Sequence, residues 1–283
     1  TAGDFITNIF EVTTLDHLLM FTNKGNYIFL PVHKAPEGKW KELGKHINNV
    51  VSLSPEENVI ASFIYNPTDE IVLVTKNGMI KRTKASEFEV TRTSKAMIAM
   101  KLKERDEVIG AVEAETYIIL ASKNGYYTKF NKVEIPLVGA RGSGVKAMNL
   151  KEDEIATIET IKDEEYITIF TNKNTAKRLK FSELEETGRA KRGNALMKRV
   201  KSAPYSIMKI LGTTAKTELT LITEDGKKTI KNSEIPIMDL ASTGSNIGKK
   251  NITAILKNIT AEKKENELPK EEQQTFELND FKL

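Results

Sequence analysis

Lysine and arginine are the side chains whose types and spacing in this chain predict a chemical role. Between Lys177 and Lys201 nine basic residues stand against three acidic ones, and arginines lie beside glycines in residues 141–144 and 189–193. A glycine lets the backbone approach a phosphate, and a guanidinium donates paired hydrogen bonds to it. The pattern predicts binding of a polyanion, although the modest net charge of +4 leaves open that part of it is solvated surface.

Residues for other kinds of chemistry do not form the required patterns. His17, His33 and His46 lack a metal-ligand spacing, and the chain has no cysteine, which excludes disulfides and thiolate metal sites. The glycines of residues 139–144 do not follow the order of a dinucleotide-binding loop, and Gly248-Lys249-Lys250 lacks the Ser or Thr of a phosphate-binding loop. Spacing supports neither a Ser-His-Asp triad nor a carboxylate pair. We therefore expect no metal, no cofactor and no catalytic residue in this chain.

The elements that must position the basic residues recur five times. Each copy has an apolar strand, a tight turn and a second strand, and in the last four copies a short element with a glutamate followed by an apolar residue comes next; the turns lie at Gly25, Gly78, Gly125, Asn174 and Gly226. A period near 50 residues with several short strands per copy is typical of a radially repeated β architecture. The sequence predicts an all-β, propeller-like disc of four-stranded blades, with complete repeats at about 17–66, 70–114, 117–161, 166–211 and 218–258.

The repeat at 117–161 illustrates the prediction for one blade. Asn124-Gly125 is typical of a two-residue type I′ turn, and the alternation that follows it places Lys129 on the solvent face of its strand. Ile135 follows a glutamate and is expected to plug the blade. Residues 145–150 are expected to form a third strand, and residues 154–159 a fourth.

The two ends of the chain differ from the repeats. Residues 5–10 resemble the last strand of a preceding blade, so we expect one β domain over residues 1–259, followed by a polar C-terminal tail over 260–283. The chain begins without Met, which indicates a piece of something longer. No stretch approaches the roughly 20 apolar residues that cross a bilayer, and the N-terminus has no secretory signal, so a bacterial cytoplasm is the expected compartment.

Aromatic side chains could serve as platforms for base stacking. Their strand patterns instead predict burial for Phe21, Phe29, Tyr117, Phe130, Tyr166 and Phe170. Trp40 lies between Lys39 and Lys41 and could be a solvated rim anchor or a blade plug. We favour the plug.

Two longer strings resemble a known family. Trp40 to Gly44 and Gly139 to Asp153 are similar to the C-terminal DNA-binding region of the A subunit of bacterial DNA topoisomerase IV, of the Gram-positive type, and the resemblance covers roughly residues 5–256. It implies a β-pinwheel whose blades exchange an outer strand, and whose basic rim bends DNA and presents it to an ATP-dependent strand-passage core. The related A subunit of DNA gyrase carries a Gln-Arg-Arg-Gly-Gly-Lys-Gly box that is absent here. The gyrase wrapping domain therefore remains as the alternative.

The resemblance also implies partners. They are double-stranded DNA, the rest of the same topoisomerase polypeptide as a dimer and the separate ATPase polypeptide, at the nucleoid and without a membrane. ATP and Mg²⁺ would be used by other domains, and the catalytic Tyr would lie outside this non-enzymatic piece. The expected DNA-binding residues are Lys81, Arg82, Arg92, Lys95, Lys129, Arg141, Lys146, Lys177, Arg178, Lys180, Arg189, Lys191, Arg192, Lys198, Arg199, Lys227 and Lys228.

Changing Arg189, Lys191 and Arg192 to Ala is expected to weaken DNA binding without loss of stability. Two rival classes remain. A propeller that serves as a protein-interaction scaffold would have uncharged, apolar loops in place of the Arg-Gly loops, and a propeller hydrolase would need convergent carboxylates or a catalytic dyad at the centre of the disc.

Overall fold

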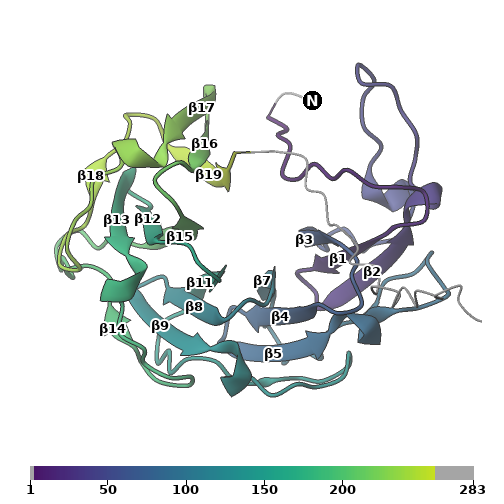
Figure 1. Cartoon of the computed structure of the whole chain (residues 1–283), viewed down its shortest axis with the longest axis horizontal. Coiled ribbons are helices and arrows are strands. Elements are labelled where there is room, and N and C mark those ends of the chain that lie inside the picture. The colour runs from purple at the N-terminus through teal and green to yellow at the C-terminus, as the bar shows by residue number, and fades with distance from the viewer. Residues whose placement is uncertain (1–2, 259–283) are drawn as a thin grey trace, which may run out of the picture.

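The computed structural model describes residues 3–258, so the predicted tail at 260–283 lies outside the described residues. Within this range β-strands and single turns of 3-10 helix build an open ring (Figure 1). No helix of this range is long and apolar enough to cross a membrane.

The strands follow one another in a regular pattern. They are β1 (His17–Thr22), β2 (Asn26–Pro31), β3 (Val59–Ile64), β4 (Glu70–Thr75), β5 (Met79–Lys84), β6 (Met97–Ile98), β7 (Val108–Glu113), β8 (Tyr117–Ser122), β9 (Tyr126–Asn131), β10 (Val145–Lys146), β11 (Ile155–Ile161), β12 (Tyr166–Thr171), β13 (Thr175–Lys180), β14 (Asn194–Ala195), β15 (Ile207–Thr213), β16 (Glu218–Thr223), β17 (Gly226–Lys231), β18 (Ser245–Asn246) and β19 (Ile252–Lys257). The 3-10 turns are η1 (Val32–Lys34), η2 (Ile47–Asn49), η3 (Ala85–Phe88), η4 (Lys132–Glu134), η5 (Phe181–Glu183) and η6 (Asn232–Glu234).

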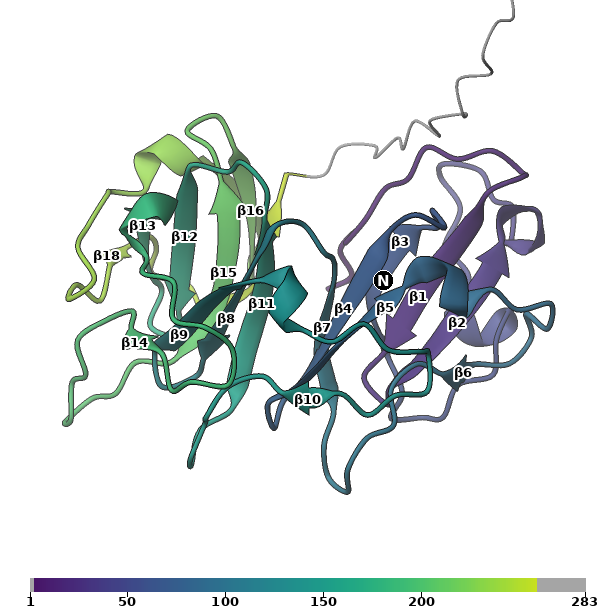
Figure 2. The ribbon, with the colours of Figure 1, turned by 60° about the horizontal axis from the view of Figure 1, so that its bottom comes forward.

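Neighbouring blades exchange a strand, as the resemblance implied. The sheet orders are β3-β1-β2-β6, β10-β5-β4-β7, β11-β8-β9-β14 and β15-β12-β13-β18, so the short outer strand of each blade comes from the following repeat. The fifth sheet, β17-β16-β19, has three strands among the described residues. The inner strands β3, β7, β11, β15 and β19 face the axis, and the exchanged strands lie at the circumference (Figures 1 and 2).

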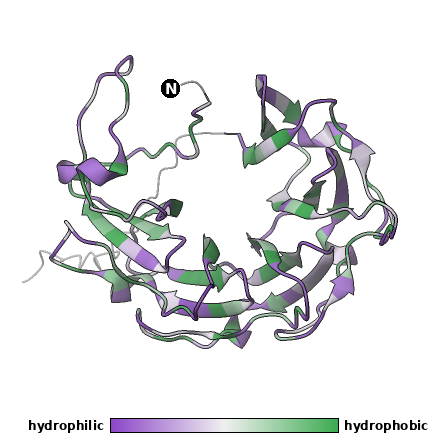
Figure 3. Cartoon of the chain, turned by 180° about the vertical axis from the view of Figure 1, so that it is seen from behind, coloured by the Kyte–Doolittle hydropathy of each residue, from purple (hydrophilic) through white to green (hydrophobic). Residues whose placement is uncertain are grey.

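The hydrophobic core lies between successive blades. Alternate residues of one central strand face opposite neighbours: Val72 and Val74 pack toward the third blade, whereas Ile71 and Leu73 pack toward the first. The plug residues Phe88, Ile135, Leu184 and Ile235 are all buried, which confirms the role predicted for the element with a glutamate followed by an apolar residue. Hydrophobic residues concentrate on the strands (Figure 3).

Several local predictions are wrong. Asn124 does not have a positive φ; instead Gly125 does (+89°), and its N–H donates to the Ser122 carbonyl oxygen (3.0 Å), so a type I turn followed by a left-handed glycine replaces the type I′ turn. The third strand is limited to Val145–Lys146, because it pairs with the neighbouring blade over only two residues. No strand forms over 5–10, where Phe10 alone takes part in a bridge.

Trp40 does not plug a blade. Its side chain is 92% exposed, in the loop between η1 and η2. Of the aromatic residues expected in the core, five are buried, and Tyr117 is half-buried.

Candidate nucleic-acid interface

The basic candidates divide into two populations, one of which lies on the outside of the ring. A loop joins each plug to the exchanged strand that follows it. The exchanged strand pairs with the second hairpin strand (β2, β5, β9 or β13) of the preceding blade, so the loop runs along the circumference. We call residues 89–96, 136–144, 185–193 and 236–244 the rim loops. The exposed candidates, on these loops and on the strands and segments beside them, are Arg92, Lys95, Arg141, Lys146, Lys180, Lys191, Lys198, Arg199, Lys227 and Lys228.

The second population is buried. Lys81, Lys129, Lys177 and Arg178 are all less than one-tenth exposed, so the expectation that Lys129 lies on the solvent face of its strand is wrong, and these four residues are not available for direct contact with DNA. A buried ammonium or guanidinium must find hydrogen-bond acceptors inside the protein. These four side chains find them on the backbone of the following blade or of the exchanged segment.

Lys81 and Lys177 occupy equivalent positions and reach a rim loop of the following repeat. The Lys81 ammonium donates to the carbonyl oxygens of Gly139 (3.0 Å) and Ala140 (2.7 Å). The Lys177 ammonium lies within hydrogen-bond distance of four carbonyl oxygens: Leu196 (2.6 Å), Asp239 (2.9 Å), Leu240 (3.2 Å) and Ser242 (2.7 Å). Burial lowers the pKa of each lysine to about 8.

The residue at the next position on the second hairpin strand of each blade (β5, β9 or β13) ties that strand to the plug of the following blade. In three consecutive blades the cation donates to the plug carbonyl oxygen: Arg82 Nε to Ile135 (3.0 Å), Lys129 Nζ to Leu184 (2.8 Å) and Arg178 Nε to Ile235 (2.6 Å). Lys129 also lies 4.0 Å from the centre of the Phe181 ring, and burial lowers its pKa. Half-buried Arg82 is paired with Glu70 at 2.8 Å. These cations hold blades together.

Arg189 and Arg192 are half-buried and fasten their rim loop to the preceding repeat. Arg189 donates to the carbonyl oxygens of Glu134 (2.7 Å) and Lys146 (2.6 Å). Arg192 donates to the Leu150 carbonyl oxygen at 2.5 Å and stacks 3.9 Å from the centre of the Tyr126 ring. Replacing either arginine would release these contacts, which contradicts the expectation that both are dispensable for stability. Lys191 between them is exposed.

Strand alternation could not reveal the buried population. Alternation correctly separates two faces of a strand, but the outer face is covered by a loop about 60 residues later in the chain, as the pairing of Lys81 with Ala140 shows. A signal was present in the sequence, because a cation recurs at the same strand position in three consecutive repeats, as Arg82, Lys129 and Arg178. Each of these repeats is followed by a repeat that carries a plug. Recurrence at a fixed position indicates a repeated structural contact as well as a repeated ligand contact.

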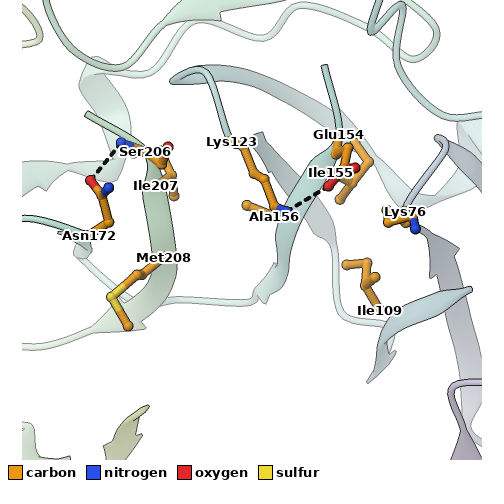
Figure 4. A pocket seen from close by; sticks show the side chains of 10 residues that line it. All are labelled: Lys76, Ile109, Lys123, Glu154, Ile155, Ala156, Asn172, Ser206, Ile207 and Met208. Carbon is orange, nitrogen blue, oxygen red and sulfur yellow. Dashed lines mark hydrogen bonds and ion pairs between the residues drawn. The ribbon is translucent and has the colours of Figure 1, made fainter. Parts of the chain in front are cut away.

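Two cavities lie away from the rim. One, of about 420 Å³, opens at the ends of inner strands and is lined by Lys76, Lys123, Glu154, Asn172 and Ser206 among others (Figure 4). Lys123 and Glu154 pair there at 2.6 Å, so their charges offset one another. The other, of about 640 Å³, is lined mainly by inner-strand residues together with Thr7 and Asn8 of the N-terminal segment, and both polar and apolar side chains face it. No group of three or more His, Cys, Asp or Glu residues that could hold a metal ion occurs in residues 3–258.

The blades with an exchanged strand, and the cations on three of the four rim loops, point to one class of protein, the β-propeller-like C-terminal domains of DNA gyrase and related topoisomerases. A sequence model described as "DNA gyrase C-terminal domain, beta-propeller" matches residues 16–66, 69–113, 116–162 and 165–202. The chain belongs to this family, which confirms the resemblance seen in its sequence.

Similar proteins within the family carry one particular name. The A subunit of DNA topoisomerase 4 from Bacillus subtilis (strain 168) is 35% identical over 249 residues, which cover 86% of this chain and 31% of the relative. The protein of that name from Staphylococcus epidermidis (strain ATCC 12228 / FDA PCI 1200) is 39% identical over 214 residues, covering 73% of this chain and 26% of the relative. The chain thus spans between a quarter and a third of the length of the curated relatives it matches.

Solved structures agree with the sequence relatives. The crystal structure of the C-terminal domain of DNA topoisomerase IV matches with a TM-score of 0.82 and 33% identity, covering 88% of this chain and 80% of that one. The DNA gyrase A C-terminal domain matches with a TM-score of 0.72 and 21% identity, covering 87% of this chain and 83% of that one. This second likeness shows the fold alone.

Proposed function

We propose that this chain is a non-catalytic module that binds and bends duplex DNA as part of the A subunit of a DNA topoisomerase IV. The observation that carries the proposal is the placement of exposed cations on consecutive rim loops, such as Arg92 and Lys95, Arg141, and Lys191. A duplex that follows the circumference would meet them in turn. The names of the similar proteins support the same assignment.

The proposed mechanism is electrostatic. Each exposed lysine or arginine that approaches a phosphate releases condensed counterions, and the sum of these contacts offsets a bending cost on the order of 1–6 kcal/mol for a short site. Phosphate contacts position a duplex without reading its bases, so sequence preference should be weak. Lys81, Lys129, Lys177 and Arg178 are removed from the set of direct contacts, because their charged groups are buried.

The partners of the module follow from the proposed assignment. The module would present bent DNA to the rest of its own polypeptide, which would act as a dimer together with the separate ATPase polypeptide, and ATP and Mg²⁺ would be used by those other domains. The setting would be the bacterial cytoplasm, at the nucleoid, and the reactions served would be decatenation and supercoil relaxation.

A salt titration with single-charge variants tests the proposal. Affinity for a short duplex is measured by gel shift at several salt concentrations for the wild type, Arg141→Ala and Lys191→Ala. The matched control is Lys162→Ala, which removes an exposed lysine from the turn between β11 and β12, away from the outer strands.

The wild-type affinity should fall steeply with salt, and each rim variant should bind more weakly with a salt slope lower by about 1. Lys162→Ala should behave like the wild type. A flat salt response, or an equal loss of affinity in the control, would contradict binding on the rim.

A further inference from the structure

The loop between η1 and η2 exposes the largest apolar side chain of the protein. Trp40 is 92% exposed and Leu43 is 83% exposed, and Trp40 is the only tryptophan of the chain. Water contact over a whole indole forgoes the stabilisation that burial would give. Two such side chains three residues apart indicate a surface that a binding partner covers when the protein functions.

Two hydrogen bonds close the turn that carries Trp40. The Glu42 N–H donates to the Lys39 carbonyl oxygen at 2.9 Å, and the Glu42 carboxylate accepts from the Lys39 N–H at 3.0 Å. Trp40 therefore occupies the second position of a closed turn. Such preorganisation lowers the ordering cost of a contact made by the indole.

The same loop adjoins a rim loop that belongs to the proposed DNA path. Lys34 at its base donates to the Thr93 hydroxyl at 3.0 Å, and Ser52 beyond it bridges to Lys95. A small cavity is shared by the two segments, lined by Lys34, Pro36, Thr93 and Ser94 among others. In Figure 1 this loop, between β2 and β3, stands out from the ring. The base of the loop that carries Trp40 is therefore fastened to the rim loop that carries Arg92 and Lys95.

The charges around Trp40 favour a nucleic acid over a protein as its occupant. Lys39, Lys41 and Lys45 are exposed on the loop, and the acidic residues there are Glu37 and Glu42, the latter engaged in the turn. Cores of protein interfaces are depleted of lysine. Proteins that bend DNA place an apolar side chain among cations and insert it between base steps, which unstacks and kinks the duplex.

We infer that Trp40 is a wedge that stacks on a base step of the duplex bound along the rim, with Leu43 against the adjoining sugars. This inference rests on the proposed function, since it assumes that DNA follows the rim. It adds to that function a contact that cations alone do not supply, because lysine and arginine on phosphate position a duplex but do not kink it at a chosen step.

Because the chain holds a single tryptophan, its fluorescence reports on this contact directly. The full 283-residue chain is titrated with a short mixed-sequence duplex while indole emission is recorded. In parallel, gel shift measures affinity, and energy transfer between dyes at the duplex ends measures bending. The variants are Trp40→Ala and Trp40→Phe, with Leu15→Ala, an apolar side chain 87% exposed before β1, as the matched control.

DNA should quench the emission of the wild type, since stacking on a base quenches an indole. Trp40→Ala should bind about tenfold more weakly and bend the duplex less, Trp40→Phe should retain most of both, and Leu15→Ala should match the wild type. DNA binding with unchanged emission and an unaffected Trp40→Ala variant would overturn the wedge and leave the proposed function intact. An emission shift that follows protein concentration without DNA would also overturn it, by assigning Trp40 to a contact between copies. Absence of any DNA binding at low salt would refute the proposed function itself.

Discussion

Replacing Lys177 with methionine tests whether the buried cations hold the ring together. Lys177 is 2% exposed, and its ammonium lies among the carbonyl oxygens of Leu196, Asp239, Leu240 and Ser242. Methionine has a similar length and removes the charge and all donors. The variant therefore separates the packing of the side chain from its hydrogen bonds.

Two opposing effects set the expected magnitude. Burial lowers the Lys177 pKa from 10.5 to about 8, so keeping the ammonium charged in the folded state costs about 3 kcal/mol, which methionine avoids. The substitution leaves the Leu196, Leu240 and Ser242 carbonyl oxygens without this donor, at about 1–3 kcal/mol each, whereas the Asp239 carbonyl oxygen still accepts from the Ser242 N–H (3.2 Å). With mid-range values the cost of the lost hydrogen bonds exceeds the avoided cost of the buried charge, and the free energy of unfolding should fall by about 3 kcal/mol.

Thermal unfolding followed by circular dichroism measures this effect. For a domain of this size the loss corresponds to a Tm lower by about 6–12 °C. Lys180→Met is the control, because Lys180 ends the same strand β13 but is exposed, and its Tm should stay near that of the wild type. An unchanged or raised Tm for Lys177→Met would show that the buried ammonium does not stabilise the protein and that apolar packing alone holds the two neighbouring blades together.

Two further predictions concern pH and backbone contact. Since the Lys177 pKa is about 8 when folded and 10.5 when unfolded, the unfolded state binds more protons between these values, and stability rises with pH there. The stability gap between the wild type and Lys177→Met should be about 2 kcal/mol wider near pH ~9.5 than near pH ~7.5 in urea unfolding, and a constant gap would refute the assigned pKa. At Gly193, with φ of +79°, an added Cβ would lie 1.8 Å from the Tyr127 carbonyl oxygen. Gly193→Ala should cost at least ~3 kcal/mol in the same assay, whereas Gly248→Ala, with nothing within 4 Å, should cost far less; equal effects would contradict the close approach.

The sequence was sufficient for features that depend on short-range patterns. Hairpins followed from apolar runs and turn residues, and the plugs followed from an apolar residue after a glutamate, as Phe88 and Ile135 show. The period then indicated the bladed fold, because each repeat buries its faces against its neighbours. These features are fixed within one repeat or by simple repetition.

Features that depend on contacts between repeats could not be predicted in the same way. Lys129 alternates like a solvent-facing residue, yet the next repeat covers it and supplies the Leu184 carbonyl oxygen. Trp40 is of a residue type that is usually found in the core, yet it is exposed because its loop carries it away from the blade. In both cases burial is decided by the path of a loop, which local hydrophobicity does not encode.

The hydrogen-bond partners of the buried cations affect the electrostatic potential of the rim. Lys81 and Lys177 donate to neutral carbonyl oxygens, whereas Arg82 is paired with the carboxylate of Glu70. A carboxylate cancels the charge of its partner, but a carbonyl oxygen only solvates it, and a lysine with a pKa of about 8 is mainly charged at neutral pH. These lysines therefore add to the positive potential beneath the rim loops without touching a phosphate. The same side chains that fasten one blade to the next thus strengthen the field that the exposed cations present.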